Sequence, residues 1–227
     1  MRDKTTQAAR DMVAAMSFGE KVKYCLGYYK IHILVTAVVL VAGIMLLHTI
    51  LDKQTSLMYF GVLGGEAIDS ATLTEEMESR LGAGEKETIT VYTGLTTKPE
   101  DTGEEYYSLL TVHIAARELD VVFADVQSVS YLGRSGALSL TEEWLTGKAA
   151  EIYGDRVAEF EYLTEGNGMD DNDVCVQAPV AVDLSGSLAM EALGLDESTP
   201  YMIVISKSDR TQEIQTFLNY LYEIETQ

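Results

Sequence analysis

The chain contains few of the side chains that build disulfide frameworks and metal centres, with two cysteines and three histidines among its 227 residues. Two thiolates cannot complete a zinc site made of cysteine ligands. His113 is the only histidine after residue 51, and its place between Val112 and Ile114 in a helical pattern favours a packed side chain over a general base. The chain therefore offers little for metal binding or for catalysis by histidine.

Sequence frames that hold nucleotides or activate nucleophiles are absent as well. No segment fits the phosphate-binding frames G-x-x-x-x-G-K-[ST] or G-x-G-x-x-G. Residues 184–187 do not form the G-x-S-x-G turn of a serine hydrolase, and no pair of acidic residues stands out for glycoside cleavage. We therefore expect a non-enzymatic protein with no cofactor and no metal.

Basic residues are scarce: 16 lysines and arginines face 36 acidic residues, which gives a formal net charge of −20. The imbalance is uneven, because residues 1–30 hold six basic and three acidic residues, whereas residues 52–227 hold ten and 33. Nucleic acids and anionic lipid headgroups are polyanions, so we expect no nucleic acid partner for the acidic part. A solvated acidic surface is the simpler explanation of this charge, and basic ligands remain permitted.

One long stretch, residues 31–51, has no charged side chain. Its 21 residues would form a helix about 31 Å long, which matches a bilayer hydrocarbon core of about 30 Å. A buried core helix is usually shorter and amphipathic. A cleaved signal peptide has a shorter apolar region and an A-x-A-like site, which does not follow Leu51. We expect one transmembrane helix that remains in the mature protein.

Orientation follows from the flanks, since Lys and Arg concentrate on the cytoplasmic side of membrane helices. Residues 1–30 should be cytoplasmic and the part after residue 51 extracellular, as in a single-pass protein of the cell membrane. Cys25 and Cys175 then lie on opposite sides and cannot pair, so the outer part folds without an internal disulfide. A secreted eukaryotic domain more often carries disulfides, so a bacterial cell surface is favoured.

These observations divide the chain into four parts: a cytoplasmic juxtamembrane segment 1–30, the transmembrane helix 31–51, a connector 52–55 and an extracytoplasmic domain 56–227. In the first part, apolar residues at helical spacing up to Met16 predict a short helix that ends at Phe18 and Gly19. A loosely ordered tail fits the same residues. The last part is large enough to be one domain with its own core.

The outer part begins with alternating strand and helix patterns. They predict a strand at 56–63, a helix ended by Gly82, a strand at 88–92, a helix at 104–119 and a strand at 121–124. This order is typical of an α/β fold with a mostly parallel sheet flanked by helices. An added antiparallel β-hairpin, 157–163 with 174–182, follows, and Pro179 favours an edge strand. A short helix near 188–193, a strand at 201–206 and a C-terminal helix after Asp209 complete the domain.

The most specific pattern is residues 120–145, DVVFADVQSVSYLGRSGALSLTEEWL. It resembles the strand D-V-v-x-x-D, helix, glycine turn and apolar-L-x-L step of the type 2 periplasmic (solute) binding proteins of ABC transporters. The matching positions are Asp120, Val121, Asp125, Gly136, Ala137, Leu138 and Leu140. Residues 205–223 are similar to the end of that family, and the residues before the span resemble clostridial single-pass anchors. The resemblance implies a reduced binding protein with a single lobe.

If the sheet is parallel, a ligand should lie beyond the carboxyl ends of its strands. The residues expected there, and hence the predicted ligand-binding set, are Gly64, Gly65, Thr93, Gly94, Asp125 and Gln127. Glycine lets backbone amides approach a ligand. Asp125 could bond a sugar hydroxyl or an ammonium group, although ordinary turn residues would give the same pattern.

Two other parts of the sequence suggest binding sites for ions. Asp170, Asp171 and Asp173 are close enough in sequence to suit Ca²⁺, but the glycine and glutamate of an EF-hand loop are missing, so a solvated hairpin tip is the better interpretation. Arg134 follows the third strand and could bind an anion, although a pair with a surface acid is the more common role of such a residue.

The sequence leaves two functions open. The first is a single-pass, membrane-anchored, extracytoplasmic solute-binding module, non-enzymatic and accessory to a transporter, with a small polar ligand such as a sugar or peptide. The alternative is a cell-surface protein-interaction or envelope-complex subunit, which contacts a membrane-protein partner and no small molecule. An open polar cleft favours the first function, and an exposed apolar patch favours the second.

Overall fold

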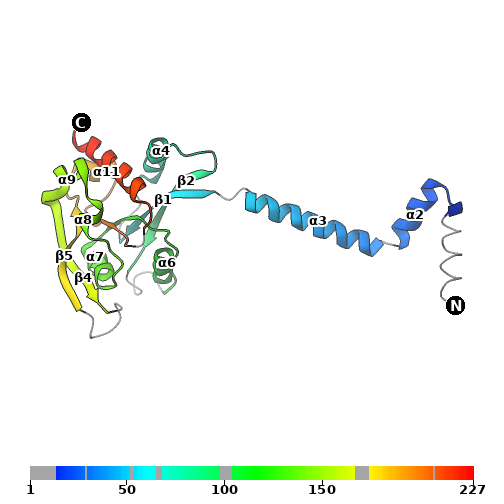
Figure 1. The fold of residues 1–227 in the computed structure, drawn as a ribbon, viewed down its shortest axis with the longest axis horizontal. Helices are drawn as coiled ribbons and strands as arrows, with labels where there is room; N and C mark the ends of the chain where they lie inside the picture. The colour runs from blue at the N-terminus through cyan, green and yellow to red at the C-terminus, as the bar shows by residue number, and fades with distance from the viewer. Residues whose placement is uncertain are drawn as a thin grey trace. The chain divides into compact units, whose positions relative to one another are not determined.

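The computed structural model describes residues 14–28, 30–51, 54–64, 68–97, 104–166, 174–206 and 208–227. The chain divides into two compact units, Met1–Lys53 and Gln54–Gln227 (Figure 1). The described part of the first unit holds the helices α2 (Phe18–Tyr28) and α3 (Lys30–Leu51). The second unit is a mixed α/β domain.

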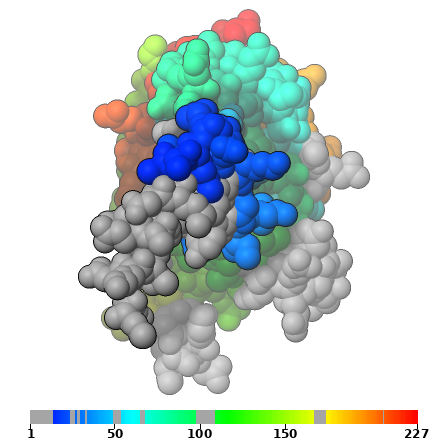
Figure 2. Space-filling model, turned by 90° about the vertical axis from the view of Figure 1, so that its right-hand side faces the viewer, coloured from blue at the N-terminus to red at the C-terminus, as the bar shows by residue number. Residues whose placement is uncertain are grey.

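Residues 14 and 15 are helical and residues 16 and 17 are not, so a helix ends before Phe18, as the sequence predicted, and α2 begins there. Ser17 stabilises the start of α2, because its backbone N–H and its hydroxyl both donate to the Glu20 carboxylate, at 2.9 and 2.8 Å. A glutamate three positions after the N-cap residue satisfies an N–H that the helix itself leaves open. The space-filling view draws the described atoms of the first unit in shades of blue (Figure 2).

Helix α3 is apolar around its whole circumference. Side chains spread along it, such as Leu40, Ile44 and Leu47, are 58–64% exposed. Among the described residues, α3 is the one helix that is long enough and apolar enough to cross a membrane. The expected length and composition of a membrane-spanning helix are thus confirmed. Its 22 residues are about 33 Å long, so it can span the hydrocarbon core.

The second unit is built on one six-stranded sheet in the order β2-β1-β3-β6-β5-β4. The strands are β1 (Thr55–Leu63), β2 (Glu87–Leu95), β3 (Val121–Ala124), β4 (Val157–Glu165), β5 (Val174–Asp183) and β6 (Tyr201–Val204). Strand β1 is parallel to β2 and β3, but the pairs β3–β6, β6–β5 and β5–β4 are antiparallel. The sheet is therefore mixed, and the prediction of a mostly parallel sheet is wrong.

The difference arises at β6, which enters the sheet between β3 and β5 and is antiparallel to both. A parallel return needs a crossover that carries the chain back along the sheet. The helix before β6, α10 (Leu188–Ala192), has only five residues and is about 7.5 Å long. The chain therefore re-enters the sheet near the end of β5, and β6 runs antiparallel to β5.

The predicted hairpin is confirmed, because β4 and β5 pair antiparallel and β4 lies at the end of the sheet. Pro179 is not on the edge strand, however, since β5 also pairs with β6. The proline lies beside a register shift between Ala158 and Glu159, and its carbonyl accepts a hydrogen bond from Thr141 Oγ1 at 3.2 Å. A bulge tolerates a residue without an N–H as well as an edge does.

Helices cover both faces of the sheet (Figure 1). The larger layer contains α4 (Ser70–Leu81), α8 (Thr141–Trp144), α9 (Gly147–Tyr153), α10 and α11 (Thr211–Glu225), with the short turn η1 (Gly154–Arg156) after α9. The smaller layer contains α6 (Glu104–Ala115) and α7 (Val126–Arg134). Fewer helices lie over the second face of the sheet, so α6 and α7 form most of the protein surface on that side.

Alternation along the strands divides the core into two clusters. In β3, Phe123 points to the larger helical layer and Val122 to the smaller one. Phe60 and Phe217 meet edge to face in the first cluster, with ring centroids 4.9 Å apart, and bring α11 onto β1. Val129 anchors α7 in the second cluster. Both faces of the central strands are thus buried.

A buried carboxylate joins three segments of the domain. Asp120, fully buried just before β3, accepts hydrogen bonds from Tyr59 N of β1 (2.8 Å) and from Ser208 Oγ (2.6 Å). Arg210 Nη1 lies 3.2 Å from the same carboxylate, and its guanidinium lies 4.7 Å from the centroid of the Tyr59 ring. Burial raises the pKa of Asp120 above its ordinary value, while these hydrogen bonds and the charge of Arg210 lower it. The network holds the segment before α11 against β1 and β3.

Asp120→Asn keeps the shape of the side chain but replaces an acceptor oxygen with an amide NH₂, which then faces the donors Tyr59 N–H or Ser208 hydroxyl. We expect the free energy of unfolding to fall by about 1–3 kcal/mol, the cost of an unsatisfied buried donor. Fluorescence of Trp144, the only tryptophan and 3% exposed, follows urea unfolding of the domain. The matched control is Asp209→Asn, whose carboxylate is 75% exposed. An equal loss in both variants contradicts the role of Asp120.

Candidate functional site

The structure brings part of the predicted ligand-binding set together. Gly64 directly follows β1 and has a φ of +81°, and a Cβ placed on it would lie 3.1 Å from Asp125 Oδ2. Asp125 follows β3 and accepts a hydrogen bond from Ser128 N at 2.7 Å, so it is the N-cap of α7. Gly64 and Asp125 therefore lie side by side at the carboxyl ends of two parallel strands. Gly65 lies outside the described residues.

Thr93 and Gly94 lie within β2 and not beyond its end, because the strand continues to Leu95. They form a bulge, since the register with the partner strand shifts between Gly61 and Leu63. Gly94 has a φ of +73°, a backbone conformation that favours glycine. The bulge accounts for this glycine without a ligand.

The polar groups at these strand ends are used within the protein. The hydroxyls of Thr97 and Ser128 lie 3.0 Å apart, and both residues are buried. Gly64 N donates to the Leu95 carbonyl at 3.3 Å. Because Asp125 caps α7, the described part of this edge is a set of internal hydrogen bonds and not an open polar cleft.

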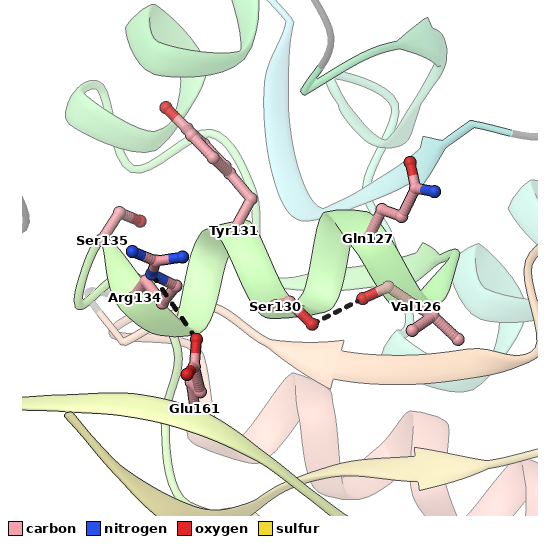
Figure 3. Close-up of a pocket in the computed structure, with 7 residues that line it drawn as sticks. All are labelled: Val126, Gln127, Ser130, Tyr131, Arg134, Ser135 and Glu161. Carbon is pink, nitrogen blue, oxygen red and sulfur yellow. Dashed lines mark hydrogen bonds and ion pairs between the residues drawn. The ribbon is translucent and has the colours of Figure 1, made fainter.

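A groove of about 500 Å³ lies instead along α7, between this helix and β4 (Figure 3). Its lining residues are Val126, Gln127, Ser130, Tyr131, Arg134, Ser135 and Glu161. Gln127 belongs to the predicted set. Arg134 Nε lies 3.5 Å from Glu161 Oε2, so Arg134 pairs with a surface acid, as the sequence indicated. The other lining residues were missed, because their helical spacing shows a shared face but not that β4 lies beside it.

The two serines of this groove have their hydroxyl protons engaged. Ser130 Oγ donates to the Val126 carbonyl and Ser135 Oγ to the Leu132 carbonyl, both at 2.9 Å. A hydroxyl that donates internally keeps its lone pairs as acceptors. The groove therefore presents hydroxyl acceptors, the amide of Gln127 and one pair of opposite charges.

Gly133 sets how closely α7 approaches β4. A Cβ on this glycine would lie 2.1 Å from the Glu161 carbonyl oxygen, far inside van der Waals contact. A larger residue would push the helix away from the strand and widen the groove. The width of the groove therefore depends on the absence of a side chain at position 133.

A second groove, of about 310 Å³, lies on the other side of α7, against α6. Its lining is mostly apolar and consists of Leu110, Thr111, Ile114, Ala115, Tyr131, Leu132, Ser135, Gly136, Ala137 and Ser206. Tyr131 and Ser135 line both grooves. Tyr131 is 37% exposed, and its ring points away from Glu161 (Figure 3). This tyrosine is the ridge between a polar and an apolar groove.

Apolar side chains stand exposed on the same two helices. Leu109 and Val112 of α6 are 39% and 57% exposed, and Val126 of α7 is 52% exposed. Single exposed apolar residues are common on soluble domains, whereas a mostly apolar groove such as the one between α6 and α7 is typical of a contact surface.

His113 packs within α6 and against β2. Its side chain is 16% exposed, its ring centroid lies 4.0 Å from that of Tyr92, and its Nδ1 lies 3.0 Å from Glu118 Oε2. Burial, followed by the charge of Glu118, raises the pKa of Tyr92. Tyr92 stacks in turn on Tyr59, with centroids 6.2 Å apart. These contacts give His113 a structural role at the α6–β2 junction.

No family model, curated protein or solved structure matches the chain. The likeness to solute-binding proteins therefore stays a prediction. Asp170, Asp171 and Asp173 lie outside the described residues. Within the part of the chain that the structure describes, no three His, Cys, Asp or Glu side chains are grouped so that they could hold a metal ion.

Gly133→Ala places a methyl group against the Glu161 carbonyl, so α7 must shift. We expect a loss of about 1–3 kcal/mol in the free energy of unfolding, as for other overpacked positions. Urea unfolding followed by Trp144 fluorescence measures it. Gly154→Ala is the matched control, because a Cβ at Gly154 meets no atom within 4 Å and its φ of −56° suits alanine. If both variants have the same stability, the close approach of α7 to β4 is contradicted.

Proposed function

We propose that the protein is a single-pass, membrane-anchored and non-enzymatic binding module, whose outer domain holds a small polar solute in the groove between α7 and β4. The observation that carries the proposal is this groove of about 500 Å³, lined by polar and charged side chains around one tyrosine. Small-molecule sites typically have volumes of about 300–1,000 Å³ with a few placed polar groups.

The lining residues suit recognition without catalysis. Gln127, Ser130 and Ser135 offer hydrogen-bonding groups, and Tyr131 offers an aromatic surface. No nucleophile with an adjacent base lies among the lining residues. A solute that displaces water from these groups gains hydrogen bonds and ring contact.

The framework of the groove is preorganised. Asp125 caps the start of α7, and Gly133 allows its backbone to lie on β4. Rigid elements place binding groups more accurately than loops do. The lining also includes Gln127, close to the carboxyl end of β3, where the sequence predicted a ligand.

The membrane anchor in this proposal is α3. Its apolar length fits a bilayer, and the basic residues before it favour a cytoplasmic N-terminus. The acidic domain would then face outward, where its negative charge keeps it away from anionic headgroups. A solute-binding domain held at the surface can serve a transporter as an accessory.

A second function is favoured by the apolar part of the same surface. The α6–α7 groove has a mostly apolar lining that includes Tyr131, and Leu109 and Val112 are exposed elsewhere on α6. Tyrosine and apolar side chains are enriched where proteins meet. In this alternative the domain contacts a protein of the cell envelope and no small molecule.

The two native cysteines test the topology directly. We expect a membrane-impermeant maleimide to label Cys175 in intact cells and Cys25 only after the membrane is opened, because the span separates them. Cys25→Ser and Cys175→Ser variants assign the signal to one thiol. Labelling of Cys25 in intact cells, or of neither cysteine until lysis, contradicts an outward-facing domain.

A thermal-shift screen of the full-length protein in detergent tests the solute. We expect at least one member of a set of sugars, short peptides, amino acids and polyamines to raise the melting temperature, since a ligand at 100 times its Kd adds about 2.7 kcal/mol. Tyr131→Ala should abolish the shift. Tyr222→Ala, on α11 in the opposite helical layer, should keep it. A shift that survives Tyr131→Ala contradicts the site, and no shift with any compound favours the protein partner.

A further inference from the structure

Helix α2 presents an apolar face to its surroundings. Phe18 and Val22 of this helix are 85% and 43% exposed. Residues four positions apart lie on the same side of a helix, so these two side chains form one face. An apolar face of this kind, with charged side chains on the rest of the helix, is typical of helices that lie in a membrane interface.

The charged side chains of α2 lie around this face as a membrane surface requires. Each residue turns a helix by about 100°, which places Lys21 and Lys23 on the two flanks of the apolar face and Glu20 on the opposite side. Lysine can lay its aliphatic stem along an apolar surface and keep its ammonium group in water. Hydrogen bonds from the backbone N–H and the hydroxyl of Ser17 lower the pKa of Glu20, so this carboxylate is ionised and suits the side that faces water.

The connection to α3 brings α2 to the bilayer surface. Helix α2 ends at Tyr28 and α3 begins at Lys30, with a single residue between them. Because one residue spans at most about 3.6 Å, the end of α2 lies close to the point where α3 enters the hydrocarbon core. Lys30 is exposed and suits the level of the lipid headgroups. The bilayer is thus the nearest apolar environment to the exposed face of α2.

The charge of the N-terminal part indicates which lipids α2 contacts. Residues 1–30 hold six basic and three acidic residues. The cytoplasmic leaflet of a cell membrane carries anionic lipids, and each lysine or arginine near such a surface increases binding about fivefold. We propose that α2 lies on the cytoplasmic surface of the membrane, with Phe18 and Val22 in the lipid and Lys21 and Lys23 on anionic headgroups. The proposal rests on α3 as the membrane anchor of the proposed function.

Attachment of α2 to the surface is reversible, because it combines two contacts that are each weak. The apolar contact is limited to one face of a helix of 11 residues. The charge contact is screened by salt, since the range of a charge falls from about 10 Å at 0.1 M salt to about 3 Å at 1 M. The attachment therefore depends on lipid composition and salt, whereas α3 stays in the bilayer under all these conditions. An attached α2 holds the start of α3 at a fixed depth.

Quenching by brominated lipids in proteoliposomes of the full-length protein tests the proposal. Phe18→Trp adds an indole on the apolar face, and the wild type gives the background of Trp144, which is 3% exposed. We expect brominated acyl chains to quench the added indole in equal parts of phosphatidylglycerol and phosphatidylcholine. Quenching should be weaker in phosphatidylcholine alone and in about 1 M salt. Lys21→Gln together with Lys23→Gln should shift the equilibrium at least about tenfold toward the detached helix.

Two controls match these variants. Gly27→Trp places the indole on the same side of α2 as Glu20, where a Cβ meets no atom within 4 Å, and should be quenched less than Phe18→Trp. Lys148→Gln together with Arg156→Gln removes two charges from the second unit and should leave the quenching unchanged.

Failure of the α2 attachment differs from failure of the membrane anchor. Equal quenching at positions 18 and 27, equal quenching in both lipid mixtures, or no effect of the two lysine substitutions overturns the proposal. Extraction with alkaline carbonate reports on α3 separately. Protein that stays in the vesicles without quenching at position 18 overturns the α2 attachment alone, whereas protein that is released overturns the α3 anchor as well.

Discussion

The fold of the second unit depends on one buried carboxylate. Asp120 sits at the entrance to β3 and is bonded to a backbone N–H of β1 and to Ser208 and Arg210 before α11. These segments are distant in the sequence but adjacent in the sheet. Removing a single partner from a buried charge costs more than the pair contributes, so the three segments must be present together. The hydrogen bonds around Asp120 therefore connect the mixed sheet to α11, the helix that completes the larger layer.

The position of α7 follows from the sheet and determines the two grooves beside it. Asp125 starts the helix at the end of β3, Val129 anchors it in the core, and Gly133 lets it lie on β4. Each side of the helix then forms a groove with a different neighbour, β4 on one side and α6 on the other. The two grooves thus exist because α7 contacts the core at Val129 and the backbone of β4 at Gly133. One groove is polar and the other is apolar because different faces of this helix line them.

Much of the fold can be read from local pattern, whereas the site cannot. Periodicity locates β1, α4, β3 and the hairpin, because each is determined by residues close in the sequence. The place of β6 depends on where the chain turns after α10, and the Thr93–Gly94 bulge depends on the register with β1, so neither is visible locally. Arg134 and Glu161 are 27 positions apart and meet only because a glycine admits the helix to the strand. A site formed between a helix and a strand that comes later in the chain leaves no recognisable pattern in the spacing of its residues.

The strand at the end of the sheet, β4, has a consequence for contact between two copies of the chain. β4 carries exposed glutamates at positions 159, 161 and 165. Were two such strands to join side by side, these negative charges would face one another, and like charges directly opposite are destabilising. Open strand borders otherwise recruit further chains and lead to aggregation. The exposed glutamates of β4 therefore oppose the pairing of two copies through this strand.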